Sequence, residues 1–317
     1  MTKSKIDLRN LGLLLDTRPE ELKAKDFLFG AGKVFGGVIN EARDHTAFLP
    51  PFESQVQNGK DSQHCVVFSG LNCIETLMKE IYDMQENYSE AFSGWANGCS
   101  DAGSMPYMLW EGVRKYGIVR QKVWDVPMLS VKGADGRFYD PKPTAEVMTD
   151  AKNWLTQFLV NYEYVSNKAD VLYDALGYAP IHVSVNWNAL KKTQDGELYY
   201  AQNPNAPYYH QVLLFKGVYG RYWEIYDHYA QDKKKVDWNY KFGWPIKATL
   251  SKLITEKYDW EFVKEKGKMP VYLRLSNRVL PINTVALYKK LSGRNDFAFR
   301  LILPEEISKY KVGPLIP

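Results

Sequence analysis

The sequence predicts an α+β fold in which a helical half comes first and a half built on an antiparallel sheet comes second. In the first half, apolar residues recur at helical spacing from Cys65 onward and would share one face of a helix over 65–81. Beyond residue 180, runs of β-branched and aromatic residues alternate with Gly, Asn, Asp and Pro, as strands alternate with turns. Helices that precede the strands, instead of alternating with them, favour the α+β class.

The same two patterns predict the remaining elements. Further helices are expected over 104–116, 144–165 and 168–176. Gly117 is suited to end the first of these because glycine often terminates a helix. Strands are expected over Ile181–Trp187, Gln211–Val218, Tyr222–Asp227 and Ile246–Leu250. The segment Gly217–Gly220 would join two of these strands as a hairpin turn.

Three segments of the chain differ in character. Residues 1–45 combine mixed charge with weak periodicity, which predicts an irregular N-terminal arm. Residues 46–263 carry the helix and strand patterns and form the expected main domain. Residues 264–317 predict a C-terminal tail or small appendage, with one strand-like run over 271–275 and one helix over 284–291.

The composition narrows the class of protein. With 317 residues, 45% of them hydrophobic, the chain is long enough to bury a sizeable core. No apolar run approaches the roughly 20 residues that span a bilayer, and no signal peptide is recognisable, so a cytoplasmic protein without a membrane span is expected. The net charge is only +4, and the short basic run Lys233–Lys235 is interpreted as a solvated face, so no nucleic-acid partner is predicted. Three cysteines and five scattered histidines predict neither a disulfide framework nor a zinc site.

Cys65 stands where a polar run turns apolar, at the expected start of a helix. The positive end of the helix dipole and the unpaired backbone N–H groups there favour a thiolate over a thiol. A thiolate is the reactive form of cysteine, and the same N–H groups can hold an oxyanion formed by attack on a carbonyl. Cys65 is therefore the candidate nucleophile.

A base for this nucleophile is expected from the sheet. His210 stands at the start of one predicted strand and Asp227 at the end of the next. Antiparallel pairing through a tight hairpin would bring both side chains to the same edge of the sheet. A cysteine, a histidine and a carboxylate that orients the imidazole together predict nucleophilic catalysis.

These residues resemble the papain-like cysteine peptidases. The matching segments follow the family's order over residues 48–250 and are HCVVFSGLNCIE, GCSDAGSMP, KYGIV, APIHVSV, YYHQVLLFKG and YWEIYDHY. The separation of Cys65 and His210 falls within the roughly 130–150 residues typical of the family. The resemblance implies a two-half fold, with a helical half and an antiparallel sheet or barrel half on either side of an active-site cleft.

The resemblance also implies roles for individual residues. Pro51-x-x-x-Gln55 is similar to the family's oxyanion-hole pattern, which makes Gln55 the preferred candidate and leaves Gln57 and Gln63 as alternatives. Gly103, Ser104 and Met105 are similar to the loop that binds an extended substrate, and Tyr229 matches the tryptophan that shields the catalytic pair.

Some positions depart from the family pattern. Asp227 stands where papain has asparagine, and a carboxylate can hold an imidazole equally well. The residue before the nucleophile is His64, which is expected at the surface because adjacent residues at a helix start point apart. Cys73 is expected in the core, and Cys99 is expected as a free thiol because its usual disulfide partner in the family is absent.

The expected activity is hydrolysis of peptide or amide bonds in a peptide or protein substrate, without a metal ion or organic cofactor. One alternative is an idle papain-like scaffold in a virion or other assembly. It is favoured by the absence of a recognisable secretory signal, by an arm shorter than a typical inhibitory pro-segment and by a C-terminal tail without an assigned role. The variant cleft motifs are similar in style to papain-like sequences of bacteria and phages. A virion-associated location would then replace a cytoplasmic one. A further alternative is an amidase that acts on cell-wall peptides through the same three residues.

Overall fold

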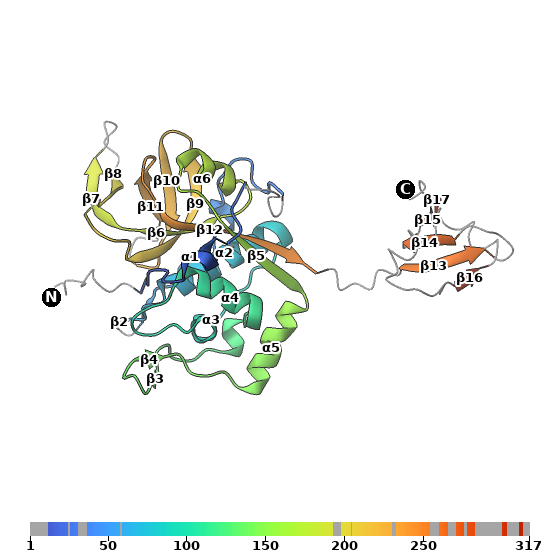
Figure 1. Ribbon diagram of the computed structural model, residues 1–317, viewed down its shortest axis with the longest axis horizontal. Coiled ribbons are helices and arrows are strands. Elements are labelled where there is room, and N and C mark those ends of the chain that lie inside the picture. Colours follow the sequence, from blue (N-terminus) through green and yellow to red (C-terminus); the bar gives the residue numbers. More distant parts are fainter. Residues whose placement is uncertain are drawn as a thin grey trace. The chain divides into compact units, whose positions relative to one another are not determined.

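The computed structural model divides the chain into two compact units, Met1–Lys252 and Leu253–Pro317 (Figure 1). In the larger unit it describes residues 12–24, 26–30, 37–57, 59–192, 198–203, 205–229 and 233–252. In the smaller unit it describes residue 253 and five strands.

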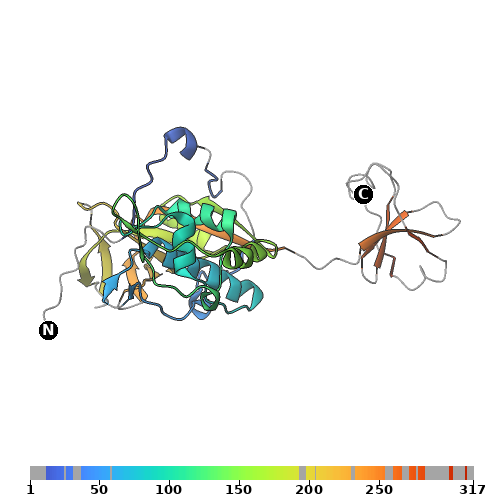
Figure 2. The same ribbon diagram turned by 90° about the horizontal axis from the view of Figure 1, so that it is seen from below.

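The larger unit places its longest described helix, α2 (Cys65–Tyr82), between a helical side and a sheet. The helix is buried without interruption from Cys65 to Met78. The other described helices are α1 (Glu20–Lys23), η1 (Thr46–Phe48), α3 (Glu90–Asn97), α4 (Pro106–Tyr116), η2 (Gln121–Val123), α5 (Ala145–Leu155) and α6 (Ala169–Leu176). The short α1 stands out from the body of this unit in Figure 2.

The central sheet of the larger unit has eight strands in the order β5-β12-β6-β9-β10-β11-β8-β7. Its pairings are antiparallel except for the parallel pair of β11 with β8. The strands are β5 (Phe158–Tyr164), β6 (Ile181–Val185), β7 (Trp187–Lys192), β8 (Leu198–Gln202), β9 (His210–Val218), β10 (Tyr222–Tyr226), β11 (Lys233–Asp237) and β12 (Gly243–Lys252). Among these described strands the order does not close on itself, so the second half is an open sheet and not a barrel.

Two small hairpins lie outside the central sheet. They are β1 (Val56–Gln57) with β2 (Lys60–Asp61), and β3 (Val131–Lys132) with β4 (Phe138–Tyr139). The first hairpin fills the stretch between Gln55 and Cys65, so it brings Asp61 close to the start of α2.

The helical side packs closely on α2 because glycine is present at the contact. A Cβ atom on Gly70 would lie 1.9 Å from Cδ2 of Leu109 on α4. Any larger residue would therefore force the side chain of Leu109 to move. On its other side α2 packs against β6, β9 and β12, so the core lies along α2.

The predicted helix over 144–165 is wrong in its second half. The helix α5 ends at Leu155, and residues 158–164 form β5, which pairs with β12. A buried ion pair, Lys247 Nζ to Glu163 Oε2 at 2.6 Å, joins these two strands. Pairing with a strand some eighty residues later overrides the local pattern, as long-range contacts commonly override propensity.

In the larger unit, the other three predicted helices and the four predicted strands are present with small shifts at their ends. The helix α3 and the strands β7, β8 and β11 were not predicted. They are short or polar, so their periodicity is weak.

The smaller unit holds a five-stranded sheet in the order β16-β13-β14-β15-β17. Its strands are β13 (Trp260–Glu265), β14 (Val271–Leu275), β15 (Arg278–Ile282), β16 (Arg300–Ile302) and β17 (Lys311–Val312). The predicted strand over 271–275 is β14, and the predicted helix over 284–291 lies outside the described residues.

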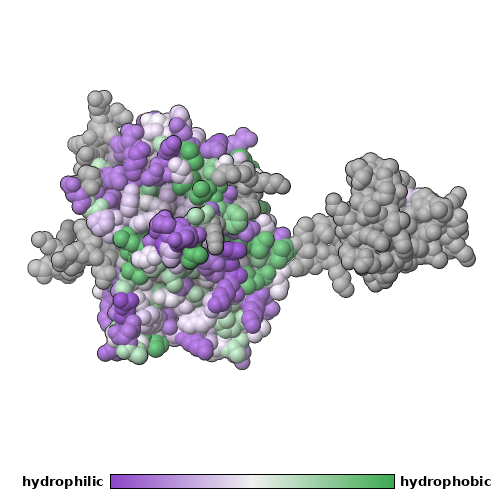
Figure 3. Space-filling view, viewed as in Figure 1, coloured by the Kyte–Doolittle hydropathy of each residue, from purple (hydrophilic) through white to green (hydrophobic). Residues whose placement is uncertain are grey.

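The described surface mixes hydrophilic and hydrophobic areas on the face shown in Figure 3. Exposed apolar side chains are ordinary on protein surfaces and need no special explanation. In the part of the chain that the structure describes, every helix is too short or too polar to cross a membrane.

Candidate active site

Cys65 is the first residue of α2, and its side chain is completely buried. The backbone N–H of Gln211 donates a hydrogen bond to its sulfur. Gln211 directly follows His210 on β9, so the start of α2 meets the start of β9 at this point. The residues predicted as nucleophile and base therefore lie at the ends of two elements that meet.

His210 and Asp227 are in direct contact. His210 Nε2 lies 2.7 Å from Asp227 Oδ1, and both side chains are buried. The contact arises because β9 and β10 pair antiparallel, with Tyr226 opposite Leu213, so the start of one strand meets the end of the other.

Asp227 has partners at both carboxylate oxygens. The backbone N–H of His228 donates to Oδ1 at 2.7 Å, and the ammonium group of Lys234 pairs with Oδ2. Burial alone would raise the pKa of the Asp227 carboxyl, but His210 and Lys234 outweigh it and hold the pKa well below its ordinary value. Asp227 is therefore ionised.

The expectation of a thiolate favoured by the helix start is wrong for this state of the molecule. Burial raises the pKa of the Cys65 thiol well above its ordinary value, although the Gln211 N–H opposes this. The negative charges of Asp61 and Asp227 raise the pKa further. The sulfur is shut off from water, and burial of this kind disfavours the charged thiolate.

Gln55 is buried next to this centre, and both of its amide N–H groups are already donated. Nε2 donates to Asp61 Oδ1 at 2.9 Å and to the hydroxyl oxygen of Tyr229 at 2.7 Å. Of the three glutamines considered, Gln57 is exposed on β1, while Gln63 donates its backbone N–H to Asp61 at 2.8 Å. Gln55 is thus the one whose side chain contacts the Tyr229 hydroxyl.

Tyr229 connects the histidine to the Asp61 carboxylate. Its ring centroid lies 5.0 Å from that of His210, and the two rings are tilted by 42°. Its hydroxyl donates to Asp61 Oδ2 at 2.5 Å. Asp61 was not among the predicted site residues, because it enters only through the hairpin β1–β2.

The predicted substrate-binding loop is occupied by the chain's own N-terminal arm. Leu13 forms a parallel β-bridge with Ser104. Leu14 N–H donates to Ser104 O, and Ser104 N–H donates to Gly12 O, each at 2.9 Å. The contact is so close that a Cβ atom on Gly103 would lie 2.0 Å from Gly12 O.

The arm is held in place by Arg18. Its guanidinium forms ion pairs with Asp16 and Asp26, each at 2.8 Å, and donates to the hydroxyl of Tyr164 at 2.9 Å. It also lies 4.2 Å above the ring of Tyr107. An arginine that stacks on an aromatic ring and pairs with carboxylates is a strong anchor.

The prediction that His64 lies at the surface is wrong. The side chain is completely buried, with Nε2 at 2.7 Å from Asp140 Oδ2 and Nδ1 hydrogen-bonded to Ser62 O. Burial lowers the pKa of His64, but Cys99 and Asp140 raise it above its ordinary value. Divergence from its neighbour Cys65 does not imply exposure, because the His64 imidazole contacts the buried Asp140 carboxylate. Cys65, Cys73 and Cys99 are all buried free thiols.

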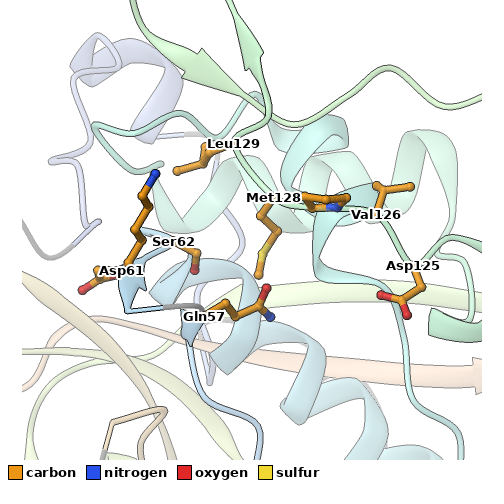
Figure 4. Close-up of a pocket in the computed structure, with 9 residues that line it drawn as sticks. Gln57, Asp61, Ser62, Asp125, Val126, Met128 and Leu129 are labelled. Carbon is orange, nitrogen blue, oxygen red and sulfur yellow. The ribbon is translucent and has the colours of Figure 1, made fainter.

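A cavity of about 540 Å³ lies between the hairpin β1–β2 and the loop over 125–129 (Figure 4). Asp61 lines one wall and Asp125 the other. Since Asp61 also contacts Gln55 and Tyr229, the cavity borders the candidate site. Within the described residues no group of three His, Cys, Asp or Glu side chains is arranged to hold a metal ion.

Comparison with known proteins gives a result at the level of structure only. No family model matches the sequence, and no curated protein matches it. Procathepsin L2, a digestive proteinase from the larval midgut of Tenebrio molitor, superimposes with a TM-score of 0.53 at 14% identity, covering 78% of this chain and 81% of that chain. Xylellain, a cysteine protease from Xylella fastidiosa, gives a TM-score of 0.53 at 17% identity, covering 78% and 98%. The fold is papain-like.

The papain-like fold confirms the fold class and the resemblance found in the motifs. At such low identity the likeness extends to the fold alone, so the chemistry of this chain has to be argued from its own residues. One of those residues, Lys234, was placed wrongly by sequence reasoning, which assigned Lys233–Lys235 to a solvated face. Only 8% of Lys234 is exposed. Alternation along a strand would have grouped Lys234 with the buried Val236, had β11 been recognised as a strand.

Proposed function

We propose that this chain is a cysteine-type peptidase that hydrolyses peptide or amide bonds through Cys65, His210 and Asp227. The observation that carries the proposal is the 2.7 Å contact of His210 Nε2 with Asp227 Oδ1 beside the buried sulfur of Cys65. With Nε2 directed at Asp227, Nδ1 is the ring nitrogen on the opposite side of the imidazole. That arrangement suits proton exchange with a cysteine.

In the proposed reaction, the proton of the Cys65 thiol moves to His210 and the thiolate attacks the carbonyl carbon of the substrate. The backbone N–H of Cys65, which belongs to the first turn of the helix, stabilises the resulting oxyanion together with Gln55. His210 then donates its proton to the leaving amine as the C–N bond breaks, which leaves a thioester. Water, deprotonated by His210, hydrolyses the thioester and regenerates the thiol.

Two features suggest that the described state is not ready to react. Gln55 has to exchange a hydrogen bond with Asp61 or Tyr229 for one with the oxyanion. The arm has to leave Ser104, so that a substrate backbone can form the β-type hydrogen bonds that the arm makes now. The predicted substrate is therefore an extended peptide or protein segment.

Activity on a mixed peptide library, compared between the wild type and Cys65→Ala, tests the proposal. Cys73→Ala is the matched control, because Cys73 is equally buried on the same helix. Cleavage that is lost in Cys65→Ala and retained in Cys73→Ala supports the peptidase. The proposal is contradicted if the wild type cleaves no peptide and its Cys65 reacts with an epoxide probe no faster than Cys73 and Cys99, at a rate that His210→Ala does not lower.

An idle scaffold is the second candidate function. It is favoured by the complete burial of Cys65 and by the arm that occupies Ser104. Labelling of the three cysteines after displacement of the arm separates the two candidates, since a scaffold leaves all three equally unreactive. An amidase would use the same three residues, and product analysis on peptidoglycan fragments against unfolded protein distinguishes it from a general peptidase.

A further inference from the structure

The strand β11 carries three consecutive lysines, and the middle one differs from its neighbours. Lys233 is exposed and Lys235 is half-buried, whereas Lys234 is only 8% exposed. In the register of β10 with β11, Lys234 lies opposite Ile225, two residues before Asp227. A lysine is almost never buried unless it is paired.

Lys234 is paired with Asp227. Its ammonium group contacts Oδ2, while Oδ1 receives His210 Nε2 and the backbone N–H of His228. The two oxygens of one carboxylate are thus divided, with the imidazole on one side and the lysine on the other. Lys234 contacts Asp227, and Asp227 in turn contacts His210.

The charge of the orienting group matters for the imidazole. A buried carboxylate beside a histidine favours the imidazolium strongly, because opposite charges interact with little screening in the interior. A lysine on the far oxygen opposes this effect and makes the pair neutral overall. A neutral orienting group is also what an asparagine side chain supplies at this position.

We propose that Lys234 is a positioning residue whose charge neutralises Asp227, so that the Asp227–Lys234 pair orients His210 as a neutral amide would. The inference rests on the proposed peptidase function for its significance, although its physical content does not depend on it. Mutual neutralisation explains why an acid at position 227 and a buried lysine occur together, because either charge alone would be costly to bury in this environment.

Other titratable groups face the same pair. Cys65 lies at the start of α2, and the charge of Asp227 acts on its thiol. His228 and Tyr229 come directly after Asp227 in the chain, and the Tyr229 hydroxyl donates to Asp61. Burial and the negative charge of Asp227 both raise the pKa of Tyr200 on β8. Lys234 is the lysine that contacts Asp227, so its removal changes the charge balance directly.

A charge cycle in the full chain tests the proposal. The variants are Lys234→Met, Asp227→Asn and the double variant Asp227→Asn/Lys234→Met, with Lys233→Met as the matched control on the exposed end of β11. Two readouts are measured: the pH titration of the His210 imidazole signals by NMR, and the pH profile of kcat/KM. Circular dichroism and thermal melting establish that each variant is folded.

We expect Lys234→Met to shift the imidazole titration and the alkaline limb of the profile upward by about one pH unit or more, because an uncompensated carboxylate retains the imidazolium. Asp227→Asn removes the negative charge beside the imidazole and shifts both readouts downward. The double variant returns the imidazole titration close to that of the wild type, and Lys234→Arg preserves it. Lys233→Met leaves both readouts unchanged.

The proposal is overturned if Lys234→Met titrates like Lys233→Met. If Lys234→Met does not fold, the double variant decides: a titration within a few tenths of a pH unit of the wild type supports neutralisation, and a shift of a full unit or more refutes it. The NMR readout needs no proteolysis. A wild type without peptidase activity whose imidazole still follows the charge cycle therefore refutes the peptidase and leaves the role of Lys234 standing. An active wild type with no charge cycle refutes the role of Lys234 alone.

Discussion

Leu13 pairs with Ser104 in a parallel β-bridge, on the loop that the motif resemblance assigns to substrate binding. The hydrogen-bonding edge that an extended substrate would use is therefore already occupied by the same chain. Because the neighbouring Gly12 lies against the carbonyl group of Gln63, two residues before Cys65, the arm and the candidate nucleophile are coupled through backbone contact.

Displacement of the arm is predicted to make Cys65 more reactive. A Cβ atom on Gly12, whose φ is +86°, would lie 2.3 Å from Gln63 O, so Gly12→Ala forces the arm away. We expect the rate of labelling of Cys65 by iodoacetamide to rise about tenfold or more, since strain of this kind costs about 1–3 kcal/mol.

Gly30→Ala is the matched control for that measurement. Gly30 also has a positive φ, of +80°, but a Cβ atom there would meet nothing within 4 Å. If both variants label Cys65 at the wild-type rate, the arm does not restrict access to the sulfur.

Asp61 is predicted to suppress the thiolate of Cys65. Its negative charge contributes to the raised pKa of the Cys65 thiol, and it holds an amide N–H of Gln55. Asp61→Asn is expected to shift the pH midpoint of Cys65 alkylation downward, because the thiolate then faces one negative charge fewer. The initial rate on peptides is expected to rise several-fold, because Gln55 becomes easier to redirect.

Asp125→Asn is the control, since Asp125 lines the opposite wall of the same cavity without contacting Gln55. An equal shift in both variants would mean that a general change of charge, and not the contact of Asp61 with the site, produces the effect.

Glu75 is predicted to make the stability depend on pH. Burial raises the pKa of this carboxyl to about 8, although the backbone N–H of Tyr88 donates to Oε1 at 2.9 Å and opposes the rise. A raised pKa means that the folded state retains a proton that the unfolded chain loses. The free energy of unfolding should therefore fall by a few kcal/mol as pH rises from about 4.5 towards 8.

Urea denaturation of wild type and Glu75→Gln at pH 5 and pH 9 measures this effect. The variant should lose less stability between the two pH values, because an amide carries no proton to lose. Glu21→Gln, at an exposed position, should behave like the wild type. A pH dependence in Glu75→Gln as steep as that of the wild type would exclude Glu75 as its source.

Sequence reasoning predicted that Cys65, His210 and Asp227 lie together, but it did not predict the residues around them. Cys65 at a helix start and His210 with Asp227 at one edge of a hairpin follow from local periodicity and from the geometry of antiparallel pairing. Asp61 and Lys234 were not predicted as site residues, because each lies on an element too short or too polar to be recognised from the sequence. Asp61 lies on the hairpin β1–β2, and Lys234 lies on the strand β11.

What the sequence alone determined is the order of the halves, the helix α2 with its cysteine, and the strand pair that carries the histidine and the aspartate. These depend on neighbours within a few residues or across one tight turn. What only the tertiary structure decided is the burial of His64, the conversion of residues 158–164 into β5, the pairing of Lys234 with Asp227 and the contact of Leu13 with Ser104. Each of these results from packing against elements that the local pattern does not specify, because burial and charge pairing depend on which distant segments meet.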